Sequence, residues 1–182
     1  MVFARWRARR ADRQAVATLA AEVTRAARRE ALFARLGVAD TPEGRFEMVA
    51  LHASLAMRRL AGLGEDGRGL AHELANALFG GFDDALREMS ISDAGIAKRM
   101  TRLAEAFYGR IAAYDKALAP GGEGALTAAL ARNVYAQPTP DAAPLAAELA
   151  HYAFAQADGL NAFALADFRG AAFTFPTPEI PS

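Results

Sequence analysis

The fold of this chain is decided by the stretch FDDALREMSISDAGIAKRM, residues 82–100, which continues to Phe107-Tyr108-Gly109-Arg110. Charged residues of both signs lie between apolar residues here, and Ser92 and Asp93 are residue types that begin helices. The stretch therefore predicts the end of one helix, a short turn and the start of a second helix. It contains no nucleophile paired with a base and no cluster of metal ligands.

The charges around this turn are expected to hold the two helices together through at least two ion pairs. The residues expected to form this ion network are Asp83, Asp84, Arg87, Asp93, Lys98 and Arg99. A second interpretation is a basic arc on the second helix, extended by Arg102 and Arg110, that binds a phosphate-rich partner. Glu105 falls within that arc, so the internal network is favoured.

Outward from this turn, helical spacing of apolar residues and helix start and stop signals divide the rest of the chain. Thr41 and Pro42 are a typical helix start, and Gly37 a typical helix end. Gly80-Gly81 predicts a kink or a close helix contact. The expected helices span residues 12–36, 42–61, 68–89, 92–120, 124–135 and 144–165.

These elements predict an all-α fold, a single-domain bundle of about six helices with an extended, proline-containing C-terminal tail. We expect three parts: a basic N-terminal arm (1–11), a helical domain (12–170) and the tail (171–182). The helix over 42–61 is apolar on most sides, since Glu47, His52 and Ser54 are its only polar residues between Phe46 and Met57. Such a helix lies at the centre of a core or is shared with a partner, and the core is favoured.

Composition narrows the class of function. The chain has 182 residues, no cysteine and 21 basic against 21 acidic residues, yet residues 1–35 hold nine arginines and three acids, a net charge of +6. That basic start either faces an anionic surface or is a solvated helix end with a loose tail. No apolar run reaches the length of a membrane span or a secretory signal. We expect a cytoplasmic protein, either free or peripheral at the inner membrane. Location in an organelle matrix after processing is the alternative.

Two motif matches are misleading. Residues 62–67 read GLGEDG, which fits GxGxxG, but a helix and not a strand precedes them. Glu148 and His151 form one Glu-x-x-His, whereas a di-iron bundle needs two such motifs and two further glutamates. We therefore expect no metal, no cofactor, no DNA partner and no enzymatic activity. An enzyme or carrier that holds a lipid-like or quinone-like ligand in a helical cavity is the alternative.

Two sequence blocks resemble the ubiquinol–cytochrome c chaperone family. The first is LFARLGVADTPEGRFEM, residues 32–48, followed by His52 and Leu60, and the second is residues 82–100 with 107–110. The resemblance implies an assembly factor for respiratory complex III that binds newly made cytochrome b or another complex III subunit. It also implies association with the ribosome near its exit tunnel. A ribosome- or RNA-binding module that uses the basic N-terminus is a further alternative.

A chaperone of this kind needs apolar surface for its client, and aromatic and arginine side chains are enriched at binding hot spots. The residues expected to form the partner-binding surface are Phe46, Val49, Ala53, Phe107, Tyr108 and Arg110.

Overall fold

The computed structural model describes residues 2–88, 93–170 and 173–177, and these residues form helices without any strand. The elements are α1 (Val2–Ala27), α2 (Glu30–Ala34), α3 (Pro42–Ala61), α4 (Glu65–Glu88), α5 (Asp93–Ala117), α6 (Glu123–Asn133), the 3₁₀ helix η1 (Pro140–Ala142), α7 (Leu145–Leu160) and α8 (Leu165–Arg169). The predicted all-α single-domain class is confirmed.

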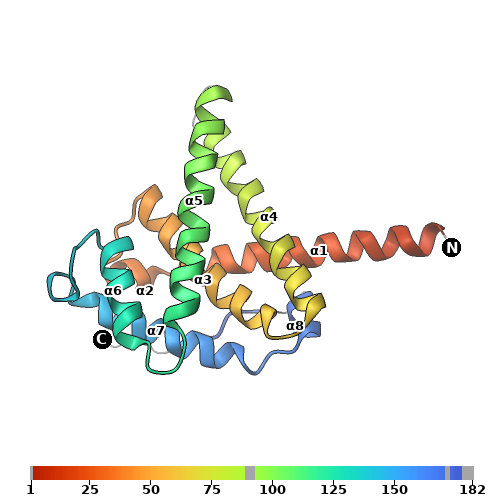
Figure 1. Cartoon of the computed structure of the whole chain (residues 1–182). Coiled ribbons are helices and arrows are strands. Elements are labelled where there is room, and N and C mark those ends of the chain that lie inside the picture. Colours follow the sequence, from red (N-terminus) through yellow and green to blue (C-terminus); the bar gives the residue numbers. More distant parts are fainter. Residues whose placement is uncertain (1, 89–92, 171–172, 178–182) are drawn as a thin grey trace.

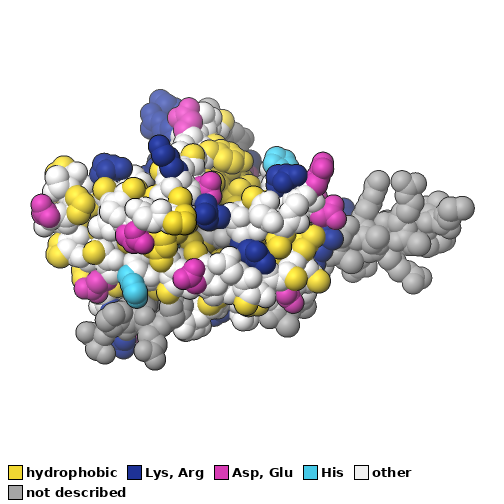
Figure 2. Space-filling model, turned by 60° about the horizontal axis from the view of Figure 1, so that its bottom comes forward, with side chains coloured by type: hydrophobic (Ala, Val, Ile, Leu, Met, Phe, Trp, Pro, Cys, Tyr) yellow, Lys and Arg dark blue, Asp and Glu magenta, His cyan; other side chains and the backbone are white. Residues whose placement is uncertain are grey.

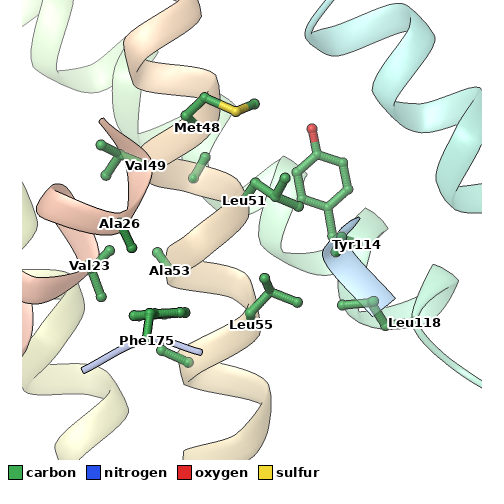
Figure 3. Packing of buried hydrophobic residues seen from close by; sticks show 14 of the residues in the cluster. Val23, Ala26, Met48, Val49, Leu51, Ala53, Leu55, Tyr114, Leu118 and Phe175 are labelled. Atoms are coloured by element: carbon green, nitrogen blue, oxygen red, sulfur yellow. The ribbon is translucent and has the colours of Figure 1, made fainter. Parts of the chain in front are cut away.

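Helix α3 is the centre of the molecule. It begins where predicted, because the Thr41 hydroxyl accepts a hydrogen bond of 3.1 Å from the Gly44 amide and Pro42 occupies the first turn. It packs against α1, α4, α5 and α7. Every residue from Glu47 to Ala56 is buried. Figure 3 shows Leu51 and Leu55 directed toward Tyr114 and Leu118, and Ala53 directed toward Val23 and Phe175. The apolar character of this helix thus reflects a core position.

Helices α4 and α5 form a hairpin that rises from the body and converges at its far end (Figure 1). The residues that join them, 89–92, lie outside the described part of the chain. Helix α4 begins at Glu65, three residues before the expected start, because the turn needs only Gly62–Gly64. The expected close contact at Gly80-Gly81 does not occur, since nothing lies within 4 Å of a Cβ built at either glycine. Helix α4 continues through both residues.

The first expected helix differs at both ends. Its backbone is helical from Val2, ten residues before the expected start, and it ends at Ala27. The chain turns at Arg29, whose ψ of 127° is extended, and resumes as the short helix α2. Gly37 then ends α2 with a left-handed φ of +63°, a conformation that glycine adopts without strain.

The last expected helix, 144–165, ends early, because α7 stops at Leu160, and a further short helix that was not expected, α8, begins at Leu165. The start of α8 is fixed by Asp167, whose carboxylate accepts a 2.7 Å hydrogen bond from the Ala164 amide. Residues 173–177 follow without helix, and they bury Phe173 and Phe175 in the core. None of the described helices is long and apolar enough to cross a membrane.

Candidate functional site

An aromatic cluster joins the central helix to the protruding hairpin. Phe46 of α3 lies 5.6 Å from Phe82 of α4, and Phe79 of α4 lies 5.7 Å from Phe82, between ring centroids. Phe79 also contacts Tyr108 of α5 at 5.8 Å. Tyr108 is 47% exposed and is the one large hydrophobic side chain exposed among the described residues. We call Phe46, Phe79, Phe82 and Tyr108 the aromatic surface.

Phe107 lies beneath this surface and supports it. Its ring is fully buried and contacts Phe79 at 5.2 Å and Tyr108 at 5.5 Å, both in edge-to-face geometry. Such aromatic pairs contribute about 0.5–1.5 kcal/mol beyond their buried area. The rings of the aromatic surface are therefore held in place by a packed layer rather than by solvent-exposed contacts alone.

An ion pair between the buried Glu47 and the partly buried Arg110 lies at the edge of the aromatic surface. The guanidinium of Arg110 donates from Nε to Glu47 Oε2 at 2.7 Å and from Nη2 to Glu47 Oε1 at 2.6 Å, a two-pronged arrangement. It also lies over the Phe46 ring, 5.7 Å from the centroid. Burial raises the pKa of Glu47, against the opposing effect of Arg110. Helices α3 and α5 are thereby tied together directly beside Phe46.

The structure divides the expected partner-binding residues into two groups. It brings Phe46, Phe107, Tyr108 and Arg110 together, but Phe107 is covered. Val49 and Ala53 are buried as well, and Ala53 lies on the side of α3 that faces Phe175 (Figure 3). Periodicity placed Val49 and Ala53 on one stripe with Phe46, but it does not show which part of a stripe other helices cover. Phe79 and Phe82 also belong to the aromatic surface and were not singled out as partner-binding residues from the sequence, although both fall at helical spacing.

The ion network around the hairpin turn is described only in part. Arg87 Nε donates to Asp83 Oδ2 at 2.7 Å within α4, between largely exposed side chains. Asp84, Lys98 and Arg99 are exposed, and the Asp93 side chain lies outside the described part. An exposed pair one helical turn apart contributes less than about 1 kcal/mol. Ion pairs between α4 and α5 remain a prediction.

A second buried polar network, which the sequence did not reveal, crosses the core from α3 to α7. His52 Nδ1 lies 2.8 Å from the Met48 carbonyl, which can only accept, so Nδ1 carries the proton. Its Nε2 then accepts from the Tyr152 hydroxyl at 2.8 Å. The Tyr152 oxygen in turn accepts from Gln156 at 2.7 Å and from Arg29 at 3.3 Å. The arrangement requires neutral His52, and burial lowers the pKa of His52 to about 4.

This network predicts a stability that decreases as the pH falls. The pKa of His52 is about 4 in the folded chain, whereas the ordinary value for histidine is 6.5, so the unfolded chain binds the proton more tightly. The contribution is fully present above pH 6.5 and is lost as the pH falls toward 4. At 1.36 kcal/mol per pKa unit it amounts to about 3 kcal/mol. Urea unfolding at pH 7, 6, 5 and 4 measures it. His52→Gln, which cannot titrate, should flatten this part of the pH profile, and an unchanged profile would contradict the assignment.

The two misleading motifs, residues 62–67 and the Glu148–His151 pair, have structural explanations. Residues 62–64 join α3 to α4, with Gly64 at a φ of +88°, and residues 65–67 form the first turn of α4. A Cβ at Gly67 would lie 2.1 Å from the Leu60 carbonyl oxygen. These glycines serve a tight turn. Glu148 and His151 are both exposed on α7. No group of three or more metal-ligating side chains occurs among the residues that the structure describes.

One of the hollows among the described residues, of ≈ 490 Å³, lies between α3, α5 and α7. Its two arginines are engaged, since Arg58 pairs with Asp115 at 2.6 Å and Arg59 donates to the Phe163 carbonyl at 2.7 Å. A small-molecule site needs polar groups that are available to a ligand, and both of these cationic groups are engaged within the chain. The hollow therefore gives no support to a lipid-like or quinone-like ligand.

Comparisons with known proteins identify the family of this chain and agree with its fold. The family model for the ubiquinol–cytochrome C chaperone matches residues 34–175. A crystal structure of the Cbp3 homolog from Brucella abortus superposes with a TM-score of 0.82 at 34% sequence identity, over 97% of both chains. No curated protein sequence matches this chain. The matched region spans α3 to α8 and includes the aromatic surface, its ion pair and most of the buried polar network. This chain belongs to the ubiquinol–cytochrome c chaperone family.

Proposed function

We propose that this protein is a non-enzymatic assembly chaperone of respiratory complex III that binds newly made cytochrome b. Family membership supports the role in complex III assembly. The observation that carries the proposal of client binding is the aromatic surface, because it keeps Tyr108 exposed above a layer of half-buried phenylalanines. Exposed apolar patches bordered by polar residues are typical of protein interaction sites.

The chemistry of the aromatic surface suits an apolar helix. Phe46, Phe79 and Phe82 are only partly buried, so an apolar segment laid across them gains further burial. A standard interface covers about 800 Å² on each partner. The Glu47–Arg110 ion pair holds the rim rigid, which lowers the entropy lost on binding. Arg110 and Tyr108 are the residues we propose for polar contacts at that rim.

The proposed client also suggests where in the cell this protein works. A client that enters the membrane is met at the membrane surface, and none of the described helices spans a bilayer. We propose a cytoplasmic protein that works peripherally at the inner membrane. Within the chain we propose the helical region 12–170 as the working domain, between the basic arm 1–11 and the tail 171–182.

Loss of this protein is expected to reduce assembled complex III while transcripts of its subunits stay unchanged. The physical reason is that an unprotected apolar segment aggregates or is degraded before assembly. Native gel analysis and cytochrome b absorbance in a deletion strain measure the effect, with the reintroduced gene as the control. Normal amounts of cytochrome b and normal complex III activity in that strain would show that the proposed function is wrong.

The N-terminal end of α1 is proposed as an electrostatic contact with an anionic surface. Residues 1–10 carry four arginines and no acid, with Phe3 and Trp6 among them. Helix α1 extends beyond the body in Figure 1. Over the face in view in Figure 2, basic and acidic side chains are interspersed. We propose that the attraction comes from the four arginines of residues 1–10.

Deleting residues 1–10 is expected to abolish weak, salt-sensitive binding to anionic vesicles or to ribosomes. Each arginine near an anionic membrane contributes about 1 kcal/mol, and salt screens this attraction. Co-sedimentation with phosphatidylglycerol vesicles and with purified ribosomes, at low and at high salt, separates the two surfaces. Equal sedimentation of the full and shortened chains in both assays would exclude this role.

A further inference from the structure

The extended residues 173–177 occupy a seat formed by α1, α3 and α7. We call this the tail seat. Phe173 and Phe175 point into the core and are 5% and 2% exposed, whereas Thr174 between them is exposed. The Phe175 ring lies edge-on to His52 at 5.5 Å and to Phe173 at 5.7 Å. Two rings spaced two residues apart thus anchor an extended strand-like segment.

The polar contacts of the tail seat are made to the main chain. The Phe175 amide donates to Glu22 Oε1 at 2.6 Å. Arg29 donates to the Phe175 carbonyl at 2.9 Å and to the Pro176 carbonyl at 2.7 Å. Both side chains belong to the region of α1 and the turn after it, far from the tail in sequence. Main-chain recognition of this kind accepts any extended segment that offers one free N–H and two successive carbonyls.

Gly159 and the buried polar residues near the tail indicate that the tail seat accommodates a bound segment. A Cβ on Gly159 of α7 would lie 2.7 Å from the Pro176 ring, so glycine is required there only while proline occupies the seat. Phe175 contacts Glu22 and His52, two of the five buried polar residues among those described. Behind them, Gln156 donates to the Tyr152 hydroxyl, which also accepts from Arg29 of the tail seat. Gln156 Oε1 is buried without a hydrogen-bond partner within the described residues. A buried polar atom without a partner costs stability, and an apolar side chain at that position would not carry this cost.

We propose that the tail seat is a peptide-binding site that residues 173–177 occupy in cis, and that it accepts an extended segment of a partner protein carrying two aromatic side chains two residues apart. Residues 173–177 themselves show how such a segment would bind, with two aromatic rings in the core and the main chain bonded to Glu22 and Arg29. A protein segment that has not yet folded has free main-chain N–H and C=O groups to offer Glu22 and Arg29. The site is separate from the aromatic surface and does not depend on the proposed function. The tethered tail competes at a high effective concentration, so the unsubstituted chain binds weakly.

The test uses the full chain and a fluorescent peptide with the sequence of residues 173–177, Phe-Thr-Phe-Pro-Thr. Phe175→Ala weakens the tail and leaves every residue of the seat intact. It is expected to bind the peptide at least about tenfold more tightly than the unsubstituted chain, because the seat is open in a larger fraction of molecules. The matched control Thr174→Ala changes an exposed tail residue and should bind like the unsubstituted chain. Adding Glu22→Leu to Phe175→Ala should remove the gain, because leucine cannot accept the main-chain hydrogen bond.

A second variant keeps the test decisive if Phe175→Ala fails to fold. Gly159→Ala displaces Pro176 and is favourable for a helix. It should bind Phe-Thr-Phe-Gly-Thr, which lacks the clashing ring, at least about tenfold more tightly than the unsubstituted chain does. Fluorescence anisotropy gives both affinities. If the folded variants bind neither peptide more tightly than the unsubstituted chain, the tail is a permanent part of the core and the proposal is overturned.

Discussion

Replacing Arg110 by methionine is expected to lower the free energy of unfolding by about 3 kcal/mol, because it leaves the buried carboxylate of Glu47 without its partner. Breaking a buried pair costs about 3–5 kcal/mol, and the lower value applies here because the Arg110 side chain keeps 22% of its surface in water. For a chain of this length the loss corresponds to a melting temperature lower by about 9 °C. Urea unfolding at pH 7 measures the free energy.

The double variant Glu47→Leu/Arg110→Met is the matched control for this prediction. It removes both charges and is expected to recover most or all of the lost stability, because an apolar pair carries no desolvation cost. Burial raises the pKa of Glu47. In the single variant the carboxyl therefore takes up a proton in the folded state, and the loss should shrink as the pH falls from 8 to 5. A single variant as stable as the unsubstituted chain would show that the pair contributes nothing to the fold.

Local signals predicted much of this fold. Thr41 and Pro42 mark the start of α3, and Gly37 and Gly64 lie in the left-handed conformation that ends or separates helices. These are effects of a few neighbouring residues, so the sequence carries them. The split at Arg29 is different. Arginine is a good helix former, and what Arg29 does in the turn is bind the carbonyls of Phe175 and Pro176, contacts that no local pattern contains.

The site was harder to predict than the helices. Glu47 is evident as a polar residue on an apolar helix, but its partner Arg110 lies 63 residues further along the chain. Val49 and Ala53 share a stripe with Phe46, yet the helices that cover them decide that only Phe46 reaches the surface. The tail was expected to be extended, but its burial depends on Glu22 and Arg29 from the opposite end of the chain. Spacing predicts faces, and tertiary packing decides which faces remain open.

The second large effect concerns the aromatic surface. Tyr108→Ala is expected to weaken recovery of cytochrome b about tenfold or more, since aromatic hot-spot residues contribute about 2 kcal/mol or more to binding. The free energy of unfolding should change little, because nearly half of the Tyr108 side chain already faces water. Tyr108→Phe retains the ring and should retain most of the binding. Thr101→Ala, an exposed position on the same helix, is the matched control.

The most direct measurement is therefore the affinity for cytochrome b in detergent, determined for the unsubstituted chain, Tyr108→Ala and Thr101→Ala by co-purification with tagged cytochrome b. We predict strong recovery with the unsubstituted chain and with Thr101→Ala, and recovery lower by about tenfold with a fully folded Tyr108→Ala. Equal recovery with all three proteins would contradict the assignment of the aromatic surface as the client-binding site. Absence of cytochrome b from every sample would contradict the proposed client itself.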